Sequence, residues 1–266
     1  MVLYYRGNLA GLDSQPVVAV VGTRKASAYG LNTARQFGKQ IASSGGVVVS
    51  GGAAGVDSMA LQGAMEVGGQ TVTVLGCGVD VTYPAKNRRL FMDLTENGCL
   101  ISEYIPGDGP ERWHFPARNR IISGLSNGVL IVEAPAKSGA LITARDALEQ
   151  GRDVYAVPAN IDMPTCEGSN ALLKDGAVLV TSGWDVVGEY AYRYPDKIHK
   201  EIPIVQPTAD KIVVDNPMPP LYSDVENNAA DLSDTEKAIL TAIGHGEQLI
   251  DTVIAETGLD SSDVLA

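Results

Sequence analysis

The sequence predicts an α/β protein in which helices cover both faces of a parallel β-sheet, followed by a small helical module. Two observations predict the first part: short apolar, β-branched runs alternate with helical patterns to about residue 190, and a glycine-rich turn closes strand after strand. A proline-rich break before several amphipathic segments predicts the second part. The length of 266 residues and the 45% hydrophobic content suit one large domain with a small appendage.

The expected strands are short and apolar throughout, as strands are when helices bury both faces of a sheet. They are expected at Val17–Val21, Val47–Val49, Thr71–Leu75, Leu100–Ser102, Val129–Val132 and Val154–Val157. Helical periodicity is found between these runs, at about Leu31–Ser43, Val56–Val67, Asn87–Asn97, Ile121–Leu125 and Ala140–Gln150.

Residues 195–231 contain six prolines among Asp and Asn, which predicts an extended linker. Helices are expected after it at Leu232–Ile243 and Leu249–Glu256, and a third opens at Asp260 after the turn residue Gly258. This outline is typical of an incomplete winged-helix-like module. We therefore expect three parts, a sheet domain over 1–190, a Pro-rich acidic linker over 191–231 and the small module over 232–266.

Composition and charge exclude several classes of protein. The sequence contains no apolar run long enough for a membrane span, no secretory signal and no cysteine spacing that suggests disulfides or zinc, so a reduced cytoplasmic protein is expected. The net charge is −12, but residues 191–266 carry 14 Asp/Glu against 5 Lys/Arg. The first 190 residues carry 18 and 15 respectively and are nearly neutral. A local basic groove there remains compatible with the overall acidity.

Glycine-rich turns are expected to meet at one edge of the sheet. The segments are Gly22–Arg24, Ser50–Gly55, Gly76–Gly78 and Ser138–Thr143, each after a strand or before a helix. The carboxyl edge of a parallel sheet presents helix N-termini and free N–H groups, which bind anions. Such turns also favour Gly for steric reasons alone, but four at one edge favour a ligand. None is a GxGxxG or Walker A motif, so no cofactor is indicated.

Cations and aromatic residues accompany these turns. The cations are Arg24, Lys25, Lys86, Arg88, Arg89, Arg118, Arg120 and Lys137, and the aromatics are Tyr83, Trp113, His114 and Phe115. Several guanidinium and ammonium groups in a row suit a polymeric anion, and aromatic rings stack on unpaired bases. Taken singly, most would be solvated surface charges or core rings. Arg24 stands out, because a cation near a helix N-terminus opposes the helix dipole unless an anion binds there.

Catalytic groupings are weak. The three histidines are scattered, no Ser–His–Asp set is suggested by spacing, and no acidic cluster has metal-ligand spacing. Glu103 and Glu133 end strands and are expected to order arginines such as Arg118 or Arg120. No catalytic residue and no metal are therefore assigned, and the protein is expected not to be an enzyme.

Six short motifs follow one another along the chain. They are Gly22-Thr23-Arg24, Ser50–Asp57, Gly76–Pro84, Phe115–Ser126, Ser138–Ala144 and Ala156-Val157-Pro158. Together they closely resemble the DprA/Smf family (DNA-processing protein A), over about Leu3 to Glu189. The resemblance implies an extended Rossmann-like domain that forms homodimers, binds single-stranded DNA without sequence preference, and loads RecA recombinase during natural transformation. The family has no established catalytic reaction.

Carried over by matching motifs, the DNA-binding candidates are Gly22, Thr23, Arg24, Lys25, Ser50, Gly51, Gly52, Lys86, Asn87, Phe115, Arg118, Asn119, Arg120, Lys137, Ser138 and Gly139. Three departures from the resemblance stand out. An N-terminal SAM-like domain is absent, so we expect either a naturally short form or a trimmed chain. Ala159-Asn160 replaces a usual Gly, and the C-terminal winged helix is expected to be truncated.

The alternative is a nucleotide-processing enzyme of the phosphoribohydrolase type, which shares the Gly-rich sheet edge. Such enzymes resemble this chain more distantly and carry a Pro-Gly-Gly-x-Gly-Thr turn followed by a helical Glu. Here the corresponding segment is Ala136–Leu141, which departs from that turn, although Glu149 falls on the following helix.

Overall fold

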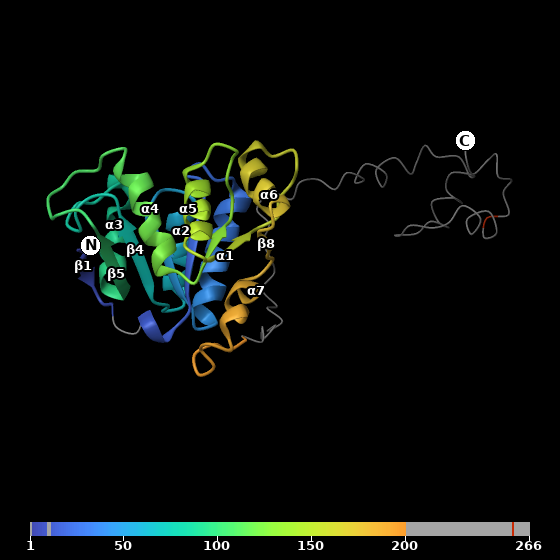
Figure 1. Ribbon diagram of the computed structural model, residues 1–266, viewed down its shortest axis with the longest axis horizontal. Coiled ribbons are helices and arrows are strands. Elements are labelled where there is room, and N and C mark those ends of the chain that lie inside the picture. The colour runs from blue at the N-terminus through green and yellow to red at the C-terminus, as the bar shows by residue number, and fades with distance from the viewer. Residues whose placement is uncertain (1, 10–11, 201–256, 258–266) are drawn as a thin grey trace, which may run out of the picture. The chain divides into compact units, whose positions relative to one another are not determined.

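A computed structural model describes residues 2–9, 12–200 and 257 of the chain (Figure 1). Their strands form one eight-stranded sheet in the order β1-β5-β4-β3-β2-β6-β7-β8. The strands are β1 Tyr4–Gly7, β2 Val17–Val21, β3 Val47–Ser50, β4 Thr71–Leu75, β5 Gly98–Ser102, β6 Gly128–Ile131, β7 Asp153–Ala156 and β8 Val178–Leu179. All neighbouring pairs are parallel except β1 with β5. The expected α/β fold is confirmed, with an antiparallel edge strand added.

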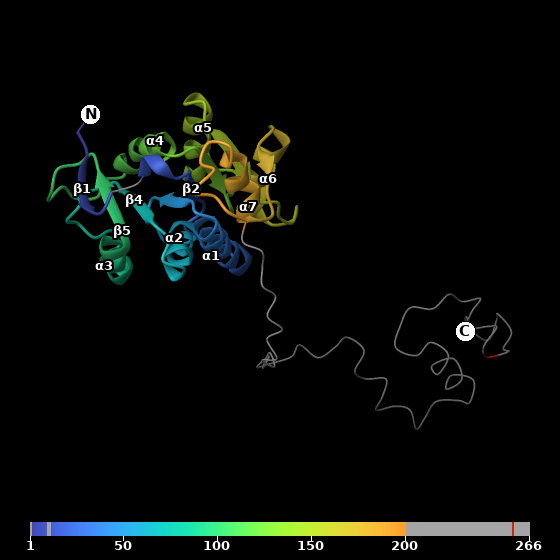
Figure 2. The same cartoon turned by 90° about the horizontal axis from the view of Figure 1, so that it is seen from below.

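Helices cover both faces of the sheet, as Figure 2 shows. The helices are α1 Ala28–Ser43, α2 Val56–Glu66, α3 Arg88–Asn97, α4 His114–Leu125, α5 Gly139–Glu149, α6 Glu167–Lys174 and α7 Gly183–Val187. Short 3₁₀ turns lie at η1 Leu12–Ser14, η2 Ala85–Asn87, η3 Pro164–Cys166 and η4 Gly188–Tyr190. Along β2, Val18 and Val20 face the layer of α1, α2, α3 and α7, whereas Val17 and Val21 face α4, α5 and α6. The uninterrupted apolar run of β2 is thereby explained.

The chain order creates a switch point at β2. From β2 the chain moves to β3 on one side, and β6 pairs with β2 on the other. The crossover connections therefore leave the carboxyl ends of β2 and β6 in opposite directions. Open α/β sheets bind ligands in the crevice that such a point leaves.

Two helices begin earlier than the periodicity predicted. Helix α1 starts at Ala28, because Ser27 caps it and accepts a hydrogen bond from the Gly30 N–H at 3.1 Å. Helix α4 starts at His114 rather than near Ile121. Pro116 lies in its first turn, where a missing N–H costs nothing. The Phe-Pro-x-Arg-Asn-Arg motif is therefore helical and not a loop.

The packed region of the first unit extends beyond residue 190. Ile198 is 9% exposed within the hydrophobic core, and the His199 N–H donates to the Ser44 carbonyl at 3.3 Å. Residues 191–200, which the composition placed in the linker, thus pack on the sheet domain. Residues 204–266 form a separate unit. All three tail helices expected from the sequence lie outside the described residues.

No helix in the described part of the chain has the length and apolar character that a membrane span requires.

Candidate nucleic-acid interface

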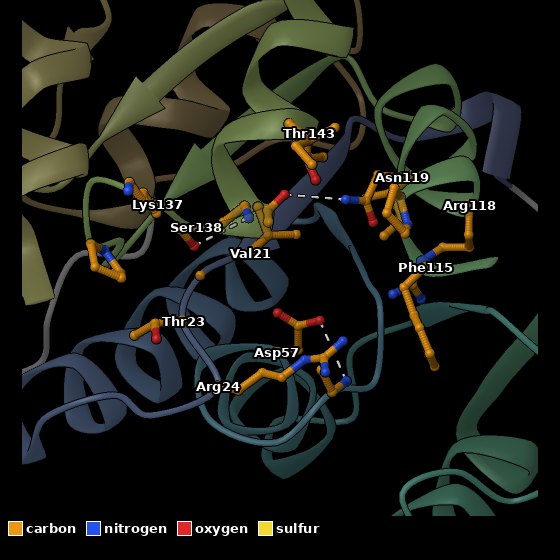
Figure 3. A pocket seen from close by; sticks show the side chains of 18 of the residues that line it. Val21, Thr23, Arg24, Asp57, Phe115, Arg118, Asn119, Lys137, Ser138 and Thr143 are labelled. Carbon is orange, nitrogen blue, oxygen red and sulfur yellow. Dashed lines mark hydrogen bonds between the residues drawn. The ribbon is translucent and has the colours of Figure 1, made fainter. Parts of the chain in front are cut away.

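A pocket of about 710 Å³ lies at the carboxyl ends of β2 and β6, and we refer to it as the carboxyl-edge pocket (Figure 3). Its walls include the turn after β2, the N-terminal halves of α4 and α5, and the segment that precedes α5. Ala53, Asp57, Tyr83 and Arg112 complete the lining from the connections that follow β3, β4 and β5. Of the sequence-predicted residues it brings together Gly22, Thr23, Arg24, Lys25, Phe115, Arg118, Asn119, Lys137, Ser138 and Gly139. The pocket occupies the switch point.

The N-terminus of α5 opens into this pocket. The Ser138 hydroxyl caps the helix by accepting from the Ala140 N–H at 3.3 Å. Nothing lies within 4 Å of the position that a Cβ on Gly139 would take, so the backbone there is open to a ligand. Asn119 donates to the Gly139 carbonyl at 3.2 Å and ties α4 to α5 (Figure 3). With exposed Lys137 beside it, this helix end attracts an anion.

The N-terminus of α1, by contrast, already holds an internal carboxylate. Glu133 is fully buried and accepts from the Ser27 hydroxyl at 2.7 Å and from the Ser27 N–H at 3.1 Å. A Cβ on Gly30 would collide with it, at 1.9 Å from a carboxylate oxygen. Glu133 therefore holds Ser27, the residue that caps α1, and the expectation that it orders an arginine is wrong. The first helix does not present a free N-terminus to an external anion.

The turn after β3 is likewise filled from within, by Arg118 and Asp57. Arg118 is 4% exposed; its guanidinium donates to the Gly51 carbonyl at 2.9 Å and also to the Val74 carbonyl. Asp57 is 6% exposed and accepts from the Gly51 N–H at 3.2 Å and the Ala53 N–H at 3.4 Å. Arg118 borders the pocket, but its hydrogen bonds hold the sheet edge together.

Burial shifts the pKa values of both Asp57 and Arg118. Burial raises the pKa of the Asp57 carboxyl above its ordinary value, and the charge of Arg118 and the backbone N–H donors only partly oppose this increase. Burial also lowers the pKa of the Arg118 guanidinium to about 10, with Asp57 opposing the change. Arg118 therefore still carries its charge at neutral pH.

Arg24 is exposed and reaches over an aromatic pair at the mouth of the pocket. Its guanidinium carbon lies 5.2 Å from the centre of the Phe115 ring, and Tyr83 packs on the same ring with centroids 5.4 Å apart. Both rings line the pocket. Arg24, Phe115 and Tyr83 thus form one cluster in the pocket lining, and a guanidinium beside aromatic rings suits a ligand that carries both a phosphate and a base.

The remaining sequence-predicted residues are placed elsewhere. Ser50 is fully buried and donates to the Val20 carbonyl, and Gly51 and Gly52 are buried beside it. Lys86 and Asn87 line a second hollow of about 610 Å³ between α1, α2 and α3, where Asn87 donates to the Gly52 carbonyl at 3.1 Å. Arg120 forms an ion pair with Glu103 at 2.6 Å, which confirms the expected role of that glutamate.

Sequence reasoning missed Arg112. This side chain is exposed and lines the pocket from the loop before α4. Its position directly before the aromatic run at 113–115 is the signal that could have found it. With Arg24, Lys25 and Lys137 it gives the pocket four exposed cations, whereas the acidic lining residue Asp57 is buried.

Glu149, the helical glutamate of the phosphoribohydrolase alternative, lies away from the pocket. Glu149 is the last residue of α5, ten residues beyond Gly139 at the pocket end. A helix rises 1.5 Å per residue, so the two are separated by about 15 Å. Glu149 is exposed there and pairs with Arg145 at 3.6 Å. Within residues 2–9 and 12–200, no three His, Cys, Asp or Glu side chains gather as metal ligands would.

Fold and site together define a doubly wound α/β protein with a cationic pocket, lined in part by aromatic rings, at its switch point. Comparison with known proteins shows to which family the chain belongs. Residues 1–191 match the family model of DNA recombination-mediator protein A, and residues 224–266 match the DprA winged helix domain. The chain belongs to the DprA/Smf family of DNA-processing proteins, and a winged-helix-like module near the C-terminus is confirmed.

Relatives from several bacteria support this membership. Protein Smf of Synechocystis is 36% identical over the whole chain and 69% of its own length, and DprA of Streptococcus pneumoniae is 44% identical over 72% of the chain and 67% of its own. The chain spans half of Escherichia coli Smf, at 45% identity over 70% of this chain.

Two solved structures share the fold of this chain. One is DprA of S. pneumoniae, with a TM-score of 0.67 at 43% identity, covering 70% of this chain and 65% of that one. The other is DNA processing protein A of Helicobacter pylori, with a TM-score of 0.66 at 31% identity, covering 72% and 87%. The H. pylori protein is described as having a single-stranded DNA binding mode.

Proposed function

We propose that this protein binds single-stranded DNA, without base-sequence preference, across the carboxyl-edge pocket. The observation that carries the proposal is the convergence of four exposed cations, two aromatic rings and the open N-terminus of α5 on one hollow. The single-stranded DNA binding of the H. pylori relative supports it. The proposed contacts are Gly22, Thr23, Arg24, Lys25, Tyr83, Arg112, Phe115, Asn119, Lys137, Ser138 and Gly139.

The chemistry favours an unpaired strand over a duplex. Phe115 and Tyr83 can stack only on bases that are not already paired and stacked. A hollow bounded by the ends of two strands and two helices fits one flexible backbone better than the wide cylinder of a duplex. Backbone N–H groups and cations contact phosphates, which are the same for every base, so little sequence preference is expected.

We further propose that the bound strand is handed to RecA recombinase, in DNA uptake and recombination in the cytoplasm, and that the protein acts as a homodimer without catalysing a reaction. Family membership supports these roles. An exposed apolar edge supports self-association: β8 ends the sheet, and its Val178 and Leu179 are 51% and 56% exposed. The three-part organisation, with a linker between sheet domain and C-terminal module, belongs to the same proposal.

The test is fluorescence anisotropy with labelled oligonucleotides of about 20 nucleotides, longer than the ~4–16 nucleotides that one OB fold covers. Single strands of mixed, poly-dT and poly-dA sequence should bind with similar affinity, and a duplex of equal length far more weakly. Equal competition by duplex would contradict the proposal. Incubation with nucleoside monophosphates should release no base, and release would favour the phosphoribohydrolase alternative.

A further inference from the structure

An exposed aromatic residue stands just outside the carboxyl-edge pocket. Trp113 is 62% exposed, at the end of the loop that joins β5 to α4. An exposed tryptophan ring offers a large, rigid apolar face on which a flat ligand group can stack. The lining of the pocket does not include Trp113, but it includes the preceding residue, Arg112.

Trp113 packs against the aromatic rings of His114 and Tyr104. Its ring meets His114 edge-on, with centroids 4.1 Å apart, and His114 stacks on Tyr104 at 3.7 Å. His114 is 4% exposed, and its Nδ1 donates to the Gly76 carbonyl at 3.0 Å. His114 is thus held in the core and is not available to a base itself. We call Tyr104, Trp113 and His114 the aromatic ledge.

The loop that carries the ledge is anchored to the end of β4. The Asp80 carboxylate accepts from the Gly107 N–H at 2.8 Å, and the Gly78 N–H donates to the Asp108 carbonyl at 3.0 Å. Because the loop is held in place before a ligand arrives, stacking on Trp113 costs little conformational entropy.

The polar edge of the indole is already satisfied. Its Nε1 donates to the Glu111 carboxylate, which leaves the ring face for a ligand. That carboxylate repels phosphate, so the position favours a base over the sugar–phosphate backbone. Arg112, between Glu111 and Trp113, faces the pocket and attracts phosphate instead.

We propose that Trp113 is a base-stacking subsite for the nucleotide that leaves the carboxyl-edge pocket past Arg112. The strand backbone passes Arg112, and the next base lies on the ring of Trp113. The subsite rests on the proposed function, because it requires a single strand in the pocket. It extends the site beyond the residues that the sequence motifs supply.

Tryptophan fluorescence tests this directly, since the chain has two tryptophans, Trp113 and Trp184. Trp184→Phe leaves Trp113 as the sole reporter and keeps an aromatic ring in α7. Titration with single-stranded oligonucleotide should quench this fluorescence in parallel with the rise in anisotropy. Binding without a change at Trp113 overturns the subsite and leaves the pocket proposal standing. No binding by the unsubstituted chain overturns both.

Variants give a second readout. Trp113→Ala should weaken binding of an oligonucleotide of about 20 bases by roughly 5-fold or more, whereas Trp113→Phe should weaken it less than about 3-fold. With an abasic oligonucleotide of the same length, Trp113→Ala should have no effect, because only the phosphates remain to be bound. Equal losses on both oligonucleotides would overturn base stacking. Tyr192→Ala, at an aromatic ring that is 85% exposed and outside the pocket lining, is the matched control.

Discussion

Replacing Arg118 by Ala separates a structural arginine from a DNA-binding one. The guanidinium bridges the turn after β3 and strand β4 through the Gly51 and Val74 carbonyls, and its charge offsets that of buried Asp57. The substitution leaves that carboxyl buried without its opposite charge. Removing one of two opposite charges that are buried near each other costs about 3–5 kcal/mol of folding free energy, because the other charge is left uncompensated. At roughly 2–4 °C per kcal/mol for a domain of this size, Tm should fall by about 6–20 °C.

Thermal unfolding followed by circular dichroism measures this loss, and a double-mutant cycle assigns its cause. Asp57→Asn in the Arg118→Ala background removes the unpaired charge and should restore about 0.5–3 kcal/mol, the usual coupling between residues of one network. Arg118→Lys keeps the charge but loses the planar fork, so it should be intermediate.

The opposite pattern would refute the reasoning. If Arg118→Ala left Tm unchanged and abolished single-strand binding, Arg118 would be a direct phosphate ligand, as the motif alone predicts. The hydrogen bonds to Gly51 and Val74 would then be dispensable for folding.

Four further outcomes are expected. Arg24→Ala should weaken single-strand binding by about 1.5–3 kcal/mol, the range for a hydrogen bond to a charged group, with Tm unchanged because the side chain is exposed. Log affinity against log salt should have a slope of about −2 to −3 if most of the four pocket cations each engage one phosphate. The folded pKa of Asp57 lies above that of an unfolded Asp, so the native state binds more protons between the two values and stability falls as pH rises through that window. Asp57→Asn should flatten this part of a Tm–pH curve. Limited proteolysis should cut first within 201–231, because of its proline-rich, acidic composition, and leave a core that ends near His199.

Each of these outcomes has a control or a contrary result. Arg145→Ala removes an exposed arginine outside the pocket lining and should leave binding unchanged, so an equal loss there would make the Arg24 effect a general charge effect. A salt slope near zero with tight binding would exclude phosphate contacts as the main source of affinity. A parallel pH dependence in the wild type and Asp57→Asn would assign the titration to another group. Resistance of 201–231 to a broad-specificity protease would argue against a linker.

The sequence by itself determined the layers of the fold. The run Val17–Val21 is apolar at every position, and such a run in a parallel sheet must be buried on both faces. Alternate residues of this strand do pack against the two helix layers, one on each face of the sheet. The glycine-rich turns also predicted which edge of the sheet holds the site, since parallel strands all end on the same side.

The two strands at the edges of the sheet, β1 and β8, form through pairing with a neighbouring strand and not from a clear local sequence pattern. Tyr4–Gly7 is largely exposed and has no strong pattern, and it becomes a strand because β5, nearly a hundred residues later, offers a hydrogen-bonding edge. The two-residue strand β8 is defined in the same way, by pairing with β7. Non-local pairing of this kind leaves no trace in local periodicity.

Only the tertiary structure decided what each charged residue of the shared motif does. Arg118 and Arg120 are chemically identical and two positions apart, but at 3.6 residues per turn they project about 200° apart around α4. One turns into the sheet edge beside Asp57, and the other pairs with Glu103 at the surface. Glu133 follows a strand as Glu103 does, yet it accepts hydrogen bonds from Ser27, the cap of α1, because that helix N-terminus lies against the end of β6. Sequence places such groups at the right edge of the sheet; whether each one faces the core or a ligand is set by the direction of its side chain and by the charges packed against it.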